Sequence, residues 1–335
     1  MIKKLHENRL IFVTGKGGVG KSTVTAALGQ ALANQGRRTL ILETDTYSAM
    51  EDLFNFRSSG LKPVKLGPNL WASNLLAEDC FIATLRRFVP SERVARAIIN
   101  NRVARVFFKA APSVNEVTIL DQVRVFFEET EGGRPRFDHV IVDLPASGHA
   151  VTFLNVPATM SGMMRGLGPI AKMAMQVSDI IKDERTTAVV AVCLPEEMPV
   201  NETIELSENL RTIIGRPLTL AMVNMVHRPP LDASQRQVFE RLRHELSPSD
   251  EREANTLFDG SSTHANPIVR LIEGNAMALG WHDRDQKYLR ILHERMREPV
   301  VEIPVFFEAN GTEIVDHIAS FLIHGDNDAE QNLAS

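Results

Sequence analysis

The sequence predicts an α/β protein with a doubly wound, mostly parallel sheet. Short, continuous apolar runs indicate strands that are buried on both faces, as in a parallel sheet. Stretches in which apolar residues recur with helical spacing lie between several of these runs, and a strand–helix–strand order is typical of doubly wound folds. The runs cover residues 10–13, 39–42, 139–142, 188–192 and 218–223.

The first helix is predicted directly after the first strand. Apolar residues recur with helical spacing between positions 24 and 32, and Gly36 follows them. Glycine commonly follows the end of a helix because it adopts the left-handed conformation without strain. Residues 10–42 therefore predict a strand, a helix and a second strand.

Two further helical stretches interrupt the alternation of strands and helices. They cover residues 77–130 and 157–185, and the strand at 139–142 with its following loop separates them in the sequence. We expect them to pack together as a helical subdomain inserted beside the sheet. A third stretch, mostly helical and rich in charge, covers residues 229–298.

A glycine-rich loop lies between the first strand and the first helix. It matches the pattern G-x-x-x-x-G-K-[S/T] and reads Gly15-Lys16-Gly17-Gly18-Val19-Gly20-Lys21-Ser22, followed by Thr23. Glycines allow backbone N–H groups to curl around phosphate oxygens, and a helix N-terminus favours negative charge. In such a loop Lys21 reaches the β- and γ-phosphates, and the Ser22 hydroxyl ligates Mg²⁺. The loop predicts a P-loop NTPase fold with ATP or ADP and Mg²⁺ as ligands.

A second lysine, Lys16, gives the loop the variant pattern K-G-G-x-G-K-[S/T]. This loop resembles that of the deviant-P-loop ATPases (the SIMIBI class). These include arsenical pump-driving ATPases, tail-anchored-protein targeting ATPases, and partitioning and division-site ATPases. The resemblance implies a homodimer in which Lys16 reaches the nucleotide of the partner subunit. Lys16 and Lys21 would then stabilise the charge that develops during ATP hydrolysis. The alternative for Lys16 is a solvated loop lysine.

Residues 43–54 resemble the first switch segment of the arsenical-pump and targeting (ArsA/GET) branch. They read E-T-D-T-Y-S-A-M-E-D-L-F, where that branch usually reads S-T-D-P-A-H-x-L-x-D-x-F. The resemblance places Asp45 at the aspartate that orients and deprotonates the attacking water, and Asp45 is also a candidate Mg²⁺ ligand together with Ser22 and Asp143. Thr46, Tyr47 and Ser48 replace proline, alanine and histidine, so we expect the dynamics or turnover of this segment to differ. The alternative for Asp45 is a cap at the end of a strand.

Residues 142–149, which read V-D-L-P-A-S-G-H, resemble the second switch segment, usually D-T-A-P-T-G-H. Asp143 ends a predicted buried strand, where its carboxylate can hold Mg²⁺ through water. Gly148 gives the backbone the freedom that a sensor of the γ-phosphate needs. The resemblance implies that His149 relays the state of the nucleotide to the helical subdomain. The alternative is a solvated loop histidine.

Two segments near the end of the sheet resemble the elements with which the family contacts adenine. Asn224 follows a predicted strand, and its carboxamide can both donate to and accept from the edge of the base. A turn residue at the end of a strand is the alternative for Asn224. Residues 303–311, which read I-P-V-F-F-E-A-N-G, resemble the pattern P-L-F-x-x-E-x-x-G. This match places Pro304 and Phe306 beside the base.

These motifs divide the chain into an ATPase core, an inserted helical subdomain and a tail. The predicted core covers residues 1–76, 131–156 and 186–323, the helical subdomain covers 77–130 and 157–185, and the flexible tail covers 324–335.

The second helical stretch contains a cluster of methionines. They are Met160, Met163, Met164, Met173 and Met175. In the targeting ATPases, helices of this region form a groove for the membrane segment of a client, and flexible thioether side chains suit varied apolar helices. The resemblance therefore indicates a protein client with a hydrophobic helix, or a membrane-associated partner. The alternative is an ordinary helical core or a dimer contact.

The segment 84–109 supports a second function. It carries many basic residues against one acidic residue, Glu92. A basic amphipathic helix contacts anionic membranes or nucleic acid, although the solvated face of a packed helix has the same pattern. The alternative function is thus a positioning ATPase that binds DNA, a membrane or a polar landmark in its ATP state. The switch sequences favour the first function, an ATP-hydrolysing switch that binds or hands over a client.

The composition excludes several other classes of protein. The 335 residues are 44% hydrophobic with a net charge of −5, which argues against general disorder and against a protein built mainly to bind nucleic acid. A run of about 18 apolar residues that could span a membrane is absent from the sequence, and the polar start lacks a signal-peptide core. We therefore expect a cytoplasmic protein. Cys80 and Cys193 are too few for a disulfide framework. The resemblance implies clustered cysteines for a metalloid site or a zinc-linked dimer, and the wide separation of these two disfavours both.

Overall fold

The computed structural model describes residues 2–89, 112–163, 168–245, 267–307 and 311–325, together with residues 91, 93, 97 and 101. Most of the basic segment 84–109 and most of the predicted tail lie outside these residues.

The central sheet of the described chain has eight strands, in the order β10-β9-β8-β1-β7-β2-β4-β3. Neighbouring strands are parallel, except that β3 pairs antiparallel with β4 at one edge. The strands are β1 (Leu10–Gly15), β2 (Thr39–Glu43), β3 (Val64–Gly67), β4 (Leu70–Asn74), β7 (His139–Asp143), β8 (Thr187–Cys193), β9 (Leu220–Val226) and β10 (Val300–Pro304). The predicted doubly wound, mostly parallel fold is confirmed, and the five predicted runs are β1, β2, β7, β8 and β9.

Helices cover both faces of this sheet. The helices of the described chain, including those that do not cover the sheet, are α1 (Lys21–Asn34), α2 (Ala49–Leu53), α3 (Ala77–Phe88), α6 (Pro112–Glu128), α7 (Ser147–Met163), α8 (Pro169–Lys182), α9 (Glu197–Asn209), α10 (Ala233–Glu245), α12 (Pro267–Arg295) and α13 (Thr312–His324). Two single turns, η1 (Ile2–Leu5) and η2 (Leu210–Ile214), and the hairpin of β5 (Thr130–Glu131) and β6 (Arg134–Pro135) complete the described elements.

The two faces of the sheet have separate hydrophobic cores. On one face α1 and α13 pack together and bury Leu28 and Leu322. On the other face α6, α7 and α9 bury Leu120, Leu154 and Ile204. All residues of β1, β2, β7 and β8 are buried, as expected for strands covered on both sides.

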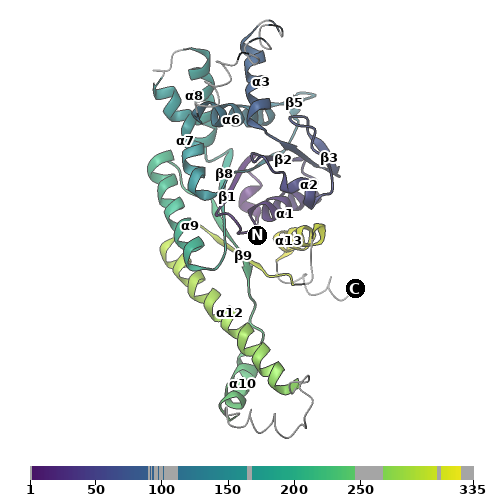
Figure 1. Cartoon of the computed structure of the whole chain (residues 1–335), viewed down its shortest axis with the longest axis vertical. Coiled ribbons are helices and arrows are strands. Elements are labelled where there is room, and N and C mark those ends of the chain that lie inside the picture. Colours follow the sequence, from purple (N-terminus) through teal and green to yellow (C-terminus); the bar gives the residue numbers. More distant parts are fainter. Residues whose placement is uncertain are drawn as a thin grey trace.

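Helices α3, α6, α7 and α8 pack together at one end of the molecule (Figure 1). Between them lies a small core of Val117, Val156, Met173 and Ala174. The residues of α6 and α7 that face the sheet belong to the large core, so this helical end is continuous with the sheet.

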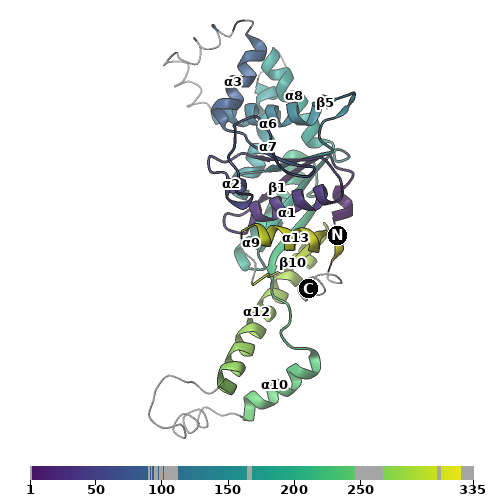
Figure 2. The ribbon, with the colours of Figure 1, turned by 90° about the vertical axis from the view of Figure 1, so that its right-hand side faces the viewer.

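At the other end, α10 and α12 form an arm that extends away from the sheet (Figures 1 and 2). With 29 residues, α12 is about 43 Å long. Its C-terminal part packs against α9 and buries Leu289 and Leu292 in the large core. The two helices of the arm are joined by an ion pair in which Arg236 donates to both carboxylate oxygens of Asp283, at 3.0 and 2.6 Å. Within the described residues, none of the helices is both long and apolar enough to cross a membrane.

Candidate functional site

The phosphate loop joins β1 to α1 at the carboxyl end of the parallel strands. Gly18 and Gly20 have φ angles of 87° and 79°, which residues with a side chain rarely adopt. A Cβ atom on Gly15 would lie 2.2 Å from the carbonyl oxygen of Val192, and Val19 is buried beneath the loop. The backbone of the loop therefore requires glycine at these positions. The loop ends at the N-terminus of α1, where the free N–H groups attract anions.

Lys21, Ser22 and Asp143 meet at this helix N-terminus. The ammonium group of Lys21 donates to Oδ1 of Asp143, and the Ser22 hydroxyl donates to Oδ2 at 2.6 Å. Thr25, one turn further along α1, donates to Oδ1 at 3.4 Å. Asp143 is only 6% exposed because it ends β7, the direct neighbour of β1. Three residues of α1 thus donate to one buried carboxylate at the end of β7.

These groups fit a magnesium nucleotide. Mg²⁺ prefers hard oxygen ligands, which the Ser22 hydroxyl and the Asp143 carboxylate provide. The Lys21 ammonium and the N–H groups of the loop provide the positive charge that phosphate oxygens need. Thr23 lies in the same first turn of α1.

The loop that carries Asp45 follows β2, the other neighbour of β7. Asp45 is exposed, and its Oδ1 accepts a hydrogen bond of 2.6 Å from the N–H of Thr46. At the start of this loop the Thr44 hydroxyl donates to the carbonyl oxygen of Asp143 at 2.8 Å. The two predicted switch segments are therefore in contact where they leave the sheet.

Sequence reasoning missed Glu43, the last residue of β2. It is 2% exposed and lies opposite Asp143 in the strand pairing. Burial raises the pKa of Glu43 to about 7, with a further increase from the charge of Asp143, although hydrogen bonds from Ser48 and Met50 oppose this rise. The available signal was an acidic residue at a strand end where the related segments usually have serine.

Lys16 contacts α9 of its own chain. Its Nζ atom forms an ion pair of 2.8 Å with Glu202 and lies 4.0 Å from the sulfur of Met198. Lys16 and Glu202 are both about one-third exposed, so the pair lies at the surface. Sequence reasoning did not identify Glu202, and the predicted contact of Lys16 with a partner subunit stays a prediction.

The family model for anion-transporting ATPases (ArsA) matches residues 8–177, half of the chain. The matched part contains the phosphate loop, the Asp45 loop and Asp143 described above. The chain belongs to the ArsA ATPase family.

Two curated ATPases are similar to the chain in sequence. The ATPase BagA of Mycobacterium tuberculosis is 29% identical over 243 residues, which cover 69% of this chain and 70% of BagA. The arsenical pump-driving ATPase of Acidiphilium multivorum is 26% identical over 218 residues, which cover 61% of this chain and 37% of the pump protein. The chain therefore matches most of BagA and a little over a third of the pump ATPase.

On the predicted adenine side of this ArsA-family chain, Asn224 lies against the phosphate loop. It is 3% exposed, and its side-chain amide donates to the carbonyl oxygen of Val19 at 3.0 Å. The amide thus holds the loop, while its role towards a base stays a prediction.

The two aromatic residues after β10 differ in exposure. Phe306 is partly buried and stacks on His317 with ring centroids 5.6 Å apart, and Pro304 is buried at the end of β10. The next residue, Phe307, is 76% exposed. The ring of Phe307 is thus the more exposed of the two, and the predicted role of Pro304 and Phe306 beside the base stays a prediction.

In this family member, the second predicted switch segment continues directly into a helix. Leu144 is buried, and its N–H donates to the carbonyl oxygen of Val13 at 2.9 Å. Gly148 and His149 belong to the first turn of α7, and the position of the His149 side chain lies outside the described part. Their roles as sensor and relay stay predictions.

The candidate client groove is only partly described. Met173 is 5% exposed and fills the small core between α6, α7 and α8, against which Met160 also packs. Met173 therefore does not line an open groove in this structure. Met175 is 46% exposed on α8, whereas the side chain of Met163 and all of Met164 lie outside the described residues.

The two cysteines of this ArsA-family chain are both buried and free. Burial raises the pKa of the Cys80 thiol and that of the Cys193 thiol to about 12, so neither is a thiolate at neutral pH. A search of the described residues finds no group of three or more His, Cys, Asp or Glu side chains that could hold a metal.

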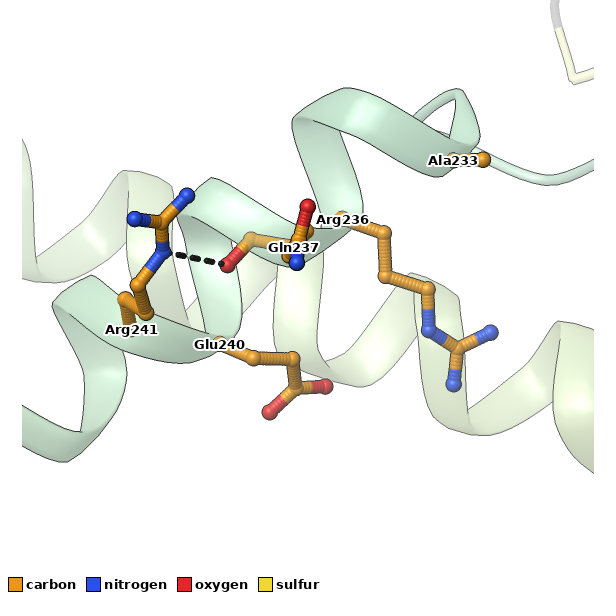
Figure 3. A pocket seen from close by; sticks show the side chains of 5 residues that line it. All are labelled: Ala233, Arg236, Gln237, Glu240 and Arg241. Carbon is orange, nitrogen blue, oxygen red and sulfur yellow. Dashed lines mark hydrogen bonds between the residues drawn. The ribbon is translucent and has the colours of Figure 1, made fainter.

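An open recess on α10 lies at the far end of the arm from the phosphate loop (Figures 1 and 3). Its lining includes Arg236, Glu240 and Arg241. Arg236 is paired with Asp283, and Arg241 donates to the carbonyl oxygen of Gln237 at 3.4 Å. The recess is separate from the nucleotide site.

Proposed function

We propose that this protein is a Mg²⁺-dependent ATPase that works as a nucleotide-driven homodimer and binds or hands over a protein client. The observation that carries this proposal is the meeting of Lys21, Ser22 and Asp143 at the N-terminus of α1, beside the loop of Asp45. Membership of the ArsA ATPase family supports the same reaction.

In the proposed reaction, water attacks the γ-phosphate in line with the bond that breaks. The N–H groups of the loop and Lys21 would bind the phosphates, and Ser22 and Asp143 would hold Mg²⁺, which would supply positive charge to the phosphate oxygens. Asp45 orients the water and accepts its proton. Lys21 of one subunit and Lys16 of the other stabilise the charge that develops on the phosphate oxygens.

Dimer formation requires Lys16 to exchange one anionic partner for another. In the single chain Lys16 pairs with Glu202 at the surface, and such exposed pairs contribute about 0–1 kcal/mol. A phosphate group of the partner's nucleotide is a stronger acceptor because its charge is larger. Nucleotide binding therefore favours release of Lys16 from α9 and closure of two subunits.

For the client, the proposal rests on the helical end of the molecule. Ile170 and Met175 of α8 are 42% and 46% exposed there. Exposed apolar side chains beside a nucleotide switch suit a client with a hydrophobic helix or a membrane-associated partner. The alternative positioning function depends on residues 84–109, most of which lie outside the described chain, so we do not favour it.

Replacing Asp45 by asparagine tests the ATPase proposal. We expect Asp45→Asn to lower the rate of ATP hydrolysis by about 100-fold or more while nucleotide affinity stays nearly unchanged, because the base is lost and the phosphate loop is intact. Steady-state hydrolysis and binding of a fluorescent ATP analogue measure the two quantities. Asp316→Asn, which changes an exposed aspartate of α13 outside this loop, is the matched control.

Two outcomes would refute this assignment. One is normal turnover by Asp45→Asn. The other is an absence of Mg²⁺-dependent hydrolysis by the unaltered protein. The mass of the Asp45→Asn protein with ATP and Mg²⁺ then tests the homodimer, and co-purified proteins identify a client.

A further inference from the structure

Glu43 holds the far end of the loop that carries Asp45. The N–H of Met50 donates to Oε1 of Glu43 at 3.0 Å, and the Ser48 hydroxyl donates to Oε2. Ser48 is also the N-cap of α2, because its Oγ atom accepts from the N–H of Glu51 at 3.2 Å. A single buried carboxylate therefore fixes the junction between the loop and α2.

The near end of the same loop is fixed to the neighbouring strand. The Thr44 hydroxyl donates to the carbonyl oxygen of Asp143, and the strand pairing places Glu43 opposite Asp143. Residues 45–47 lie between these two attachments and are exposed. The loop is thus held at both ends by residues of β2 and β7, which also position the Lys21 and Ser22 contacts.

Capping of α2 does not by itself explain a glutamate at position 43. Ser48 already supplies the N-cap, and α2 has only five residues. Burying a carboxylate is unfavourable, and the charge of the nearby Asp143 adds to that cost. A buried carboxylate that lowers the stability of the fold, at the carboxyl end of the strands, indicates that Glu43 has a role in the nucleotide site.

We propose that Glu43 is a positioning residue for ATP hydrolysis, which holds the 44–48 loop so that Asp45 faces the phosphate end of the P-loop. Glu43 acts through Ser48 and the backbone of α2, not on the reacting atoms. The inference rests on the proposed ATPase function. Ser48, one of the three departures from the family pattern, then acts together with Glu43.

Three variants of the full chain test the proposal. We expect Glu43→Ala to lower kcat by about 10- to 100-fold, because small displacements of catalytic groups are costly. Affinity for ADP with Mg²⁺ should change by less than about threefold, since the phosphate loop is untouched. Glu43→Gln should restore most of kcat because its carboxamide oxygen still accepts from Met50. Ser48→Ala, which removes one of the two contacts, should have an intermediate kcat.

The matched control is Asp138→Asn. Asp138 directly precedes β7 at the opposite end of the same strands, so this variant perturbs the scaffold without touching the loop. We expect its kcat to equal that of the unaltered protein. Hydrogen exchange of residues 44–58 gives a readout that does not depend on activity, and we expect faster exchange in Glu43→Ala than in Asp138→Asn.

The outcomes separate this inference from the ATPase proposal. Folded Glu43→Ala with unchanged kcat overturns the positioning role, as does a parallel loss of kcat and nucleotide affinity without faster exchange. A Glu43→Gln variant as slow as Glu43→Ala also overturns it. An unaltered protein that does not hydrolyse ATP instead refutes the proposed function, whatever the exchange experiment shows.

Discussion

The two ends of strands β2 and β7 are built on opposite electrostatic principles. At the amino end, Arg38 and Asp138 precede the two strands and form an ion pair with distances of 3.0 and 3.3 Å. Burial opposes ionisation of Asp138, but the hydrogen bonds from Arg38 keep its pKa below the ordinary value. At the carboxyl end, two buried carboxylates, Glu43 and Asp143, lie opposite each other.

The amino end of these strands stabilises the fold, whereas the carboxyl end forms the candidate site. Opposite charges at the amino end favour the folded state, whereas like charges at the carboxyl end oppose it. A cation at the carboxyl end offsets the repulsion between the two carboxylates. Lys21 already forms an ion pair with Asp143 there. Three further experiments test whether the two ends of these strands differ in this way.

The largest effect is expected for Lys21→Ala. Removing the cation leaves Asp143 buried beside Glu43, and breaking a buried pair costs about 3–5 kcal/mol. We expect a loss of unfolding free energy of this size, together with loss of nucleotide binding. Urea denaturation without nucleotide measures the first quantity. An unchanged stability would show that the carboxyl end does not depend on this cation.

A smaller effect is expected from the pH dependence of Glu43→Gln. The folded protein raises the pKa of Glu43 from 4.5 to about 7. The stability that the bound proton provides is complete below pH 4.5 and is lost as the pH rises through 7. The neutral glutamine avoids this loss, so the variant should gain up to about 3 kcal/mol relative to the unaltered protein between pH 5 and pH 8.

Denaturation at several pH values checks this expectation. Asp138→Asn is the control, because the pKa of Asp138 is lowered from 3.8 and its contribution is lost only as the pH falls below that value. Its stability difference should therefore be constant between pH 5 and pH 8. A constant difference for Glu43→Gln as well would contradict the contrast between the two ends.

The smallest effect is expected for Arg38→Ala. Its ion pair with Asp138 is partly exposed, and pairs of this kind contribute about 0.2–1 kcal/mol. We expect a loss of unfolding free energy in this range, decreasing at high salt, and an unchanged rate of ATP hydrolysis. A loss as large as that of Lys21→Ala would remove the distinction between the two ends.

Local patterns predicted much of the fold and of the phosphate site. The loop motif and the apolar runs are continuous in sequence, so the meeting of Lys21, Ser22 and Asp143 followed from parallel strand order. The strand β4 was not predicted, because L-W-A-S-N mixes polar and apolar residues although most of it is buried at the sheet.

Other site features depend on contacts that are distant in sequence. Lys16 and its partner Glu202 are separated by 186 positions, and only the packing of α9 beside the loop brings them together. Likewise, which of Phe306 and Phe307 is exposed depends on the exit of the chain from β10. Glu43 was missed because an acidic residue at a strand end does not by itself indicate contacts with Ser48 and Met50, which depend on the position of α2.

Because α12 is long, a small tilt at its C-terminal part would displace its N-terminal end by several times the displacement at the contact with α9. One part of this helix rests on α9, the helix that carries the partner of Lys16, and the rest projects beyond the sheet. The distance from Leu289, where α12 packs in the core, to its first residue, Pro267, is about 33 Å, so a tilt of about 5° at α9 would displace the start of α12 by about 3 Å. A movement of Lys16 that tilted α9 would therefore reach the outer end of the molecule with a larger amplitude.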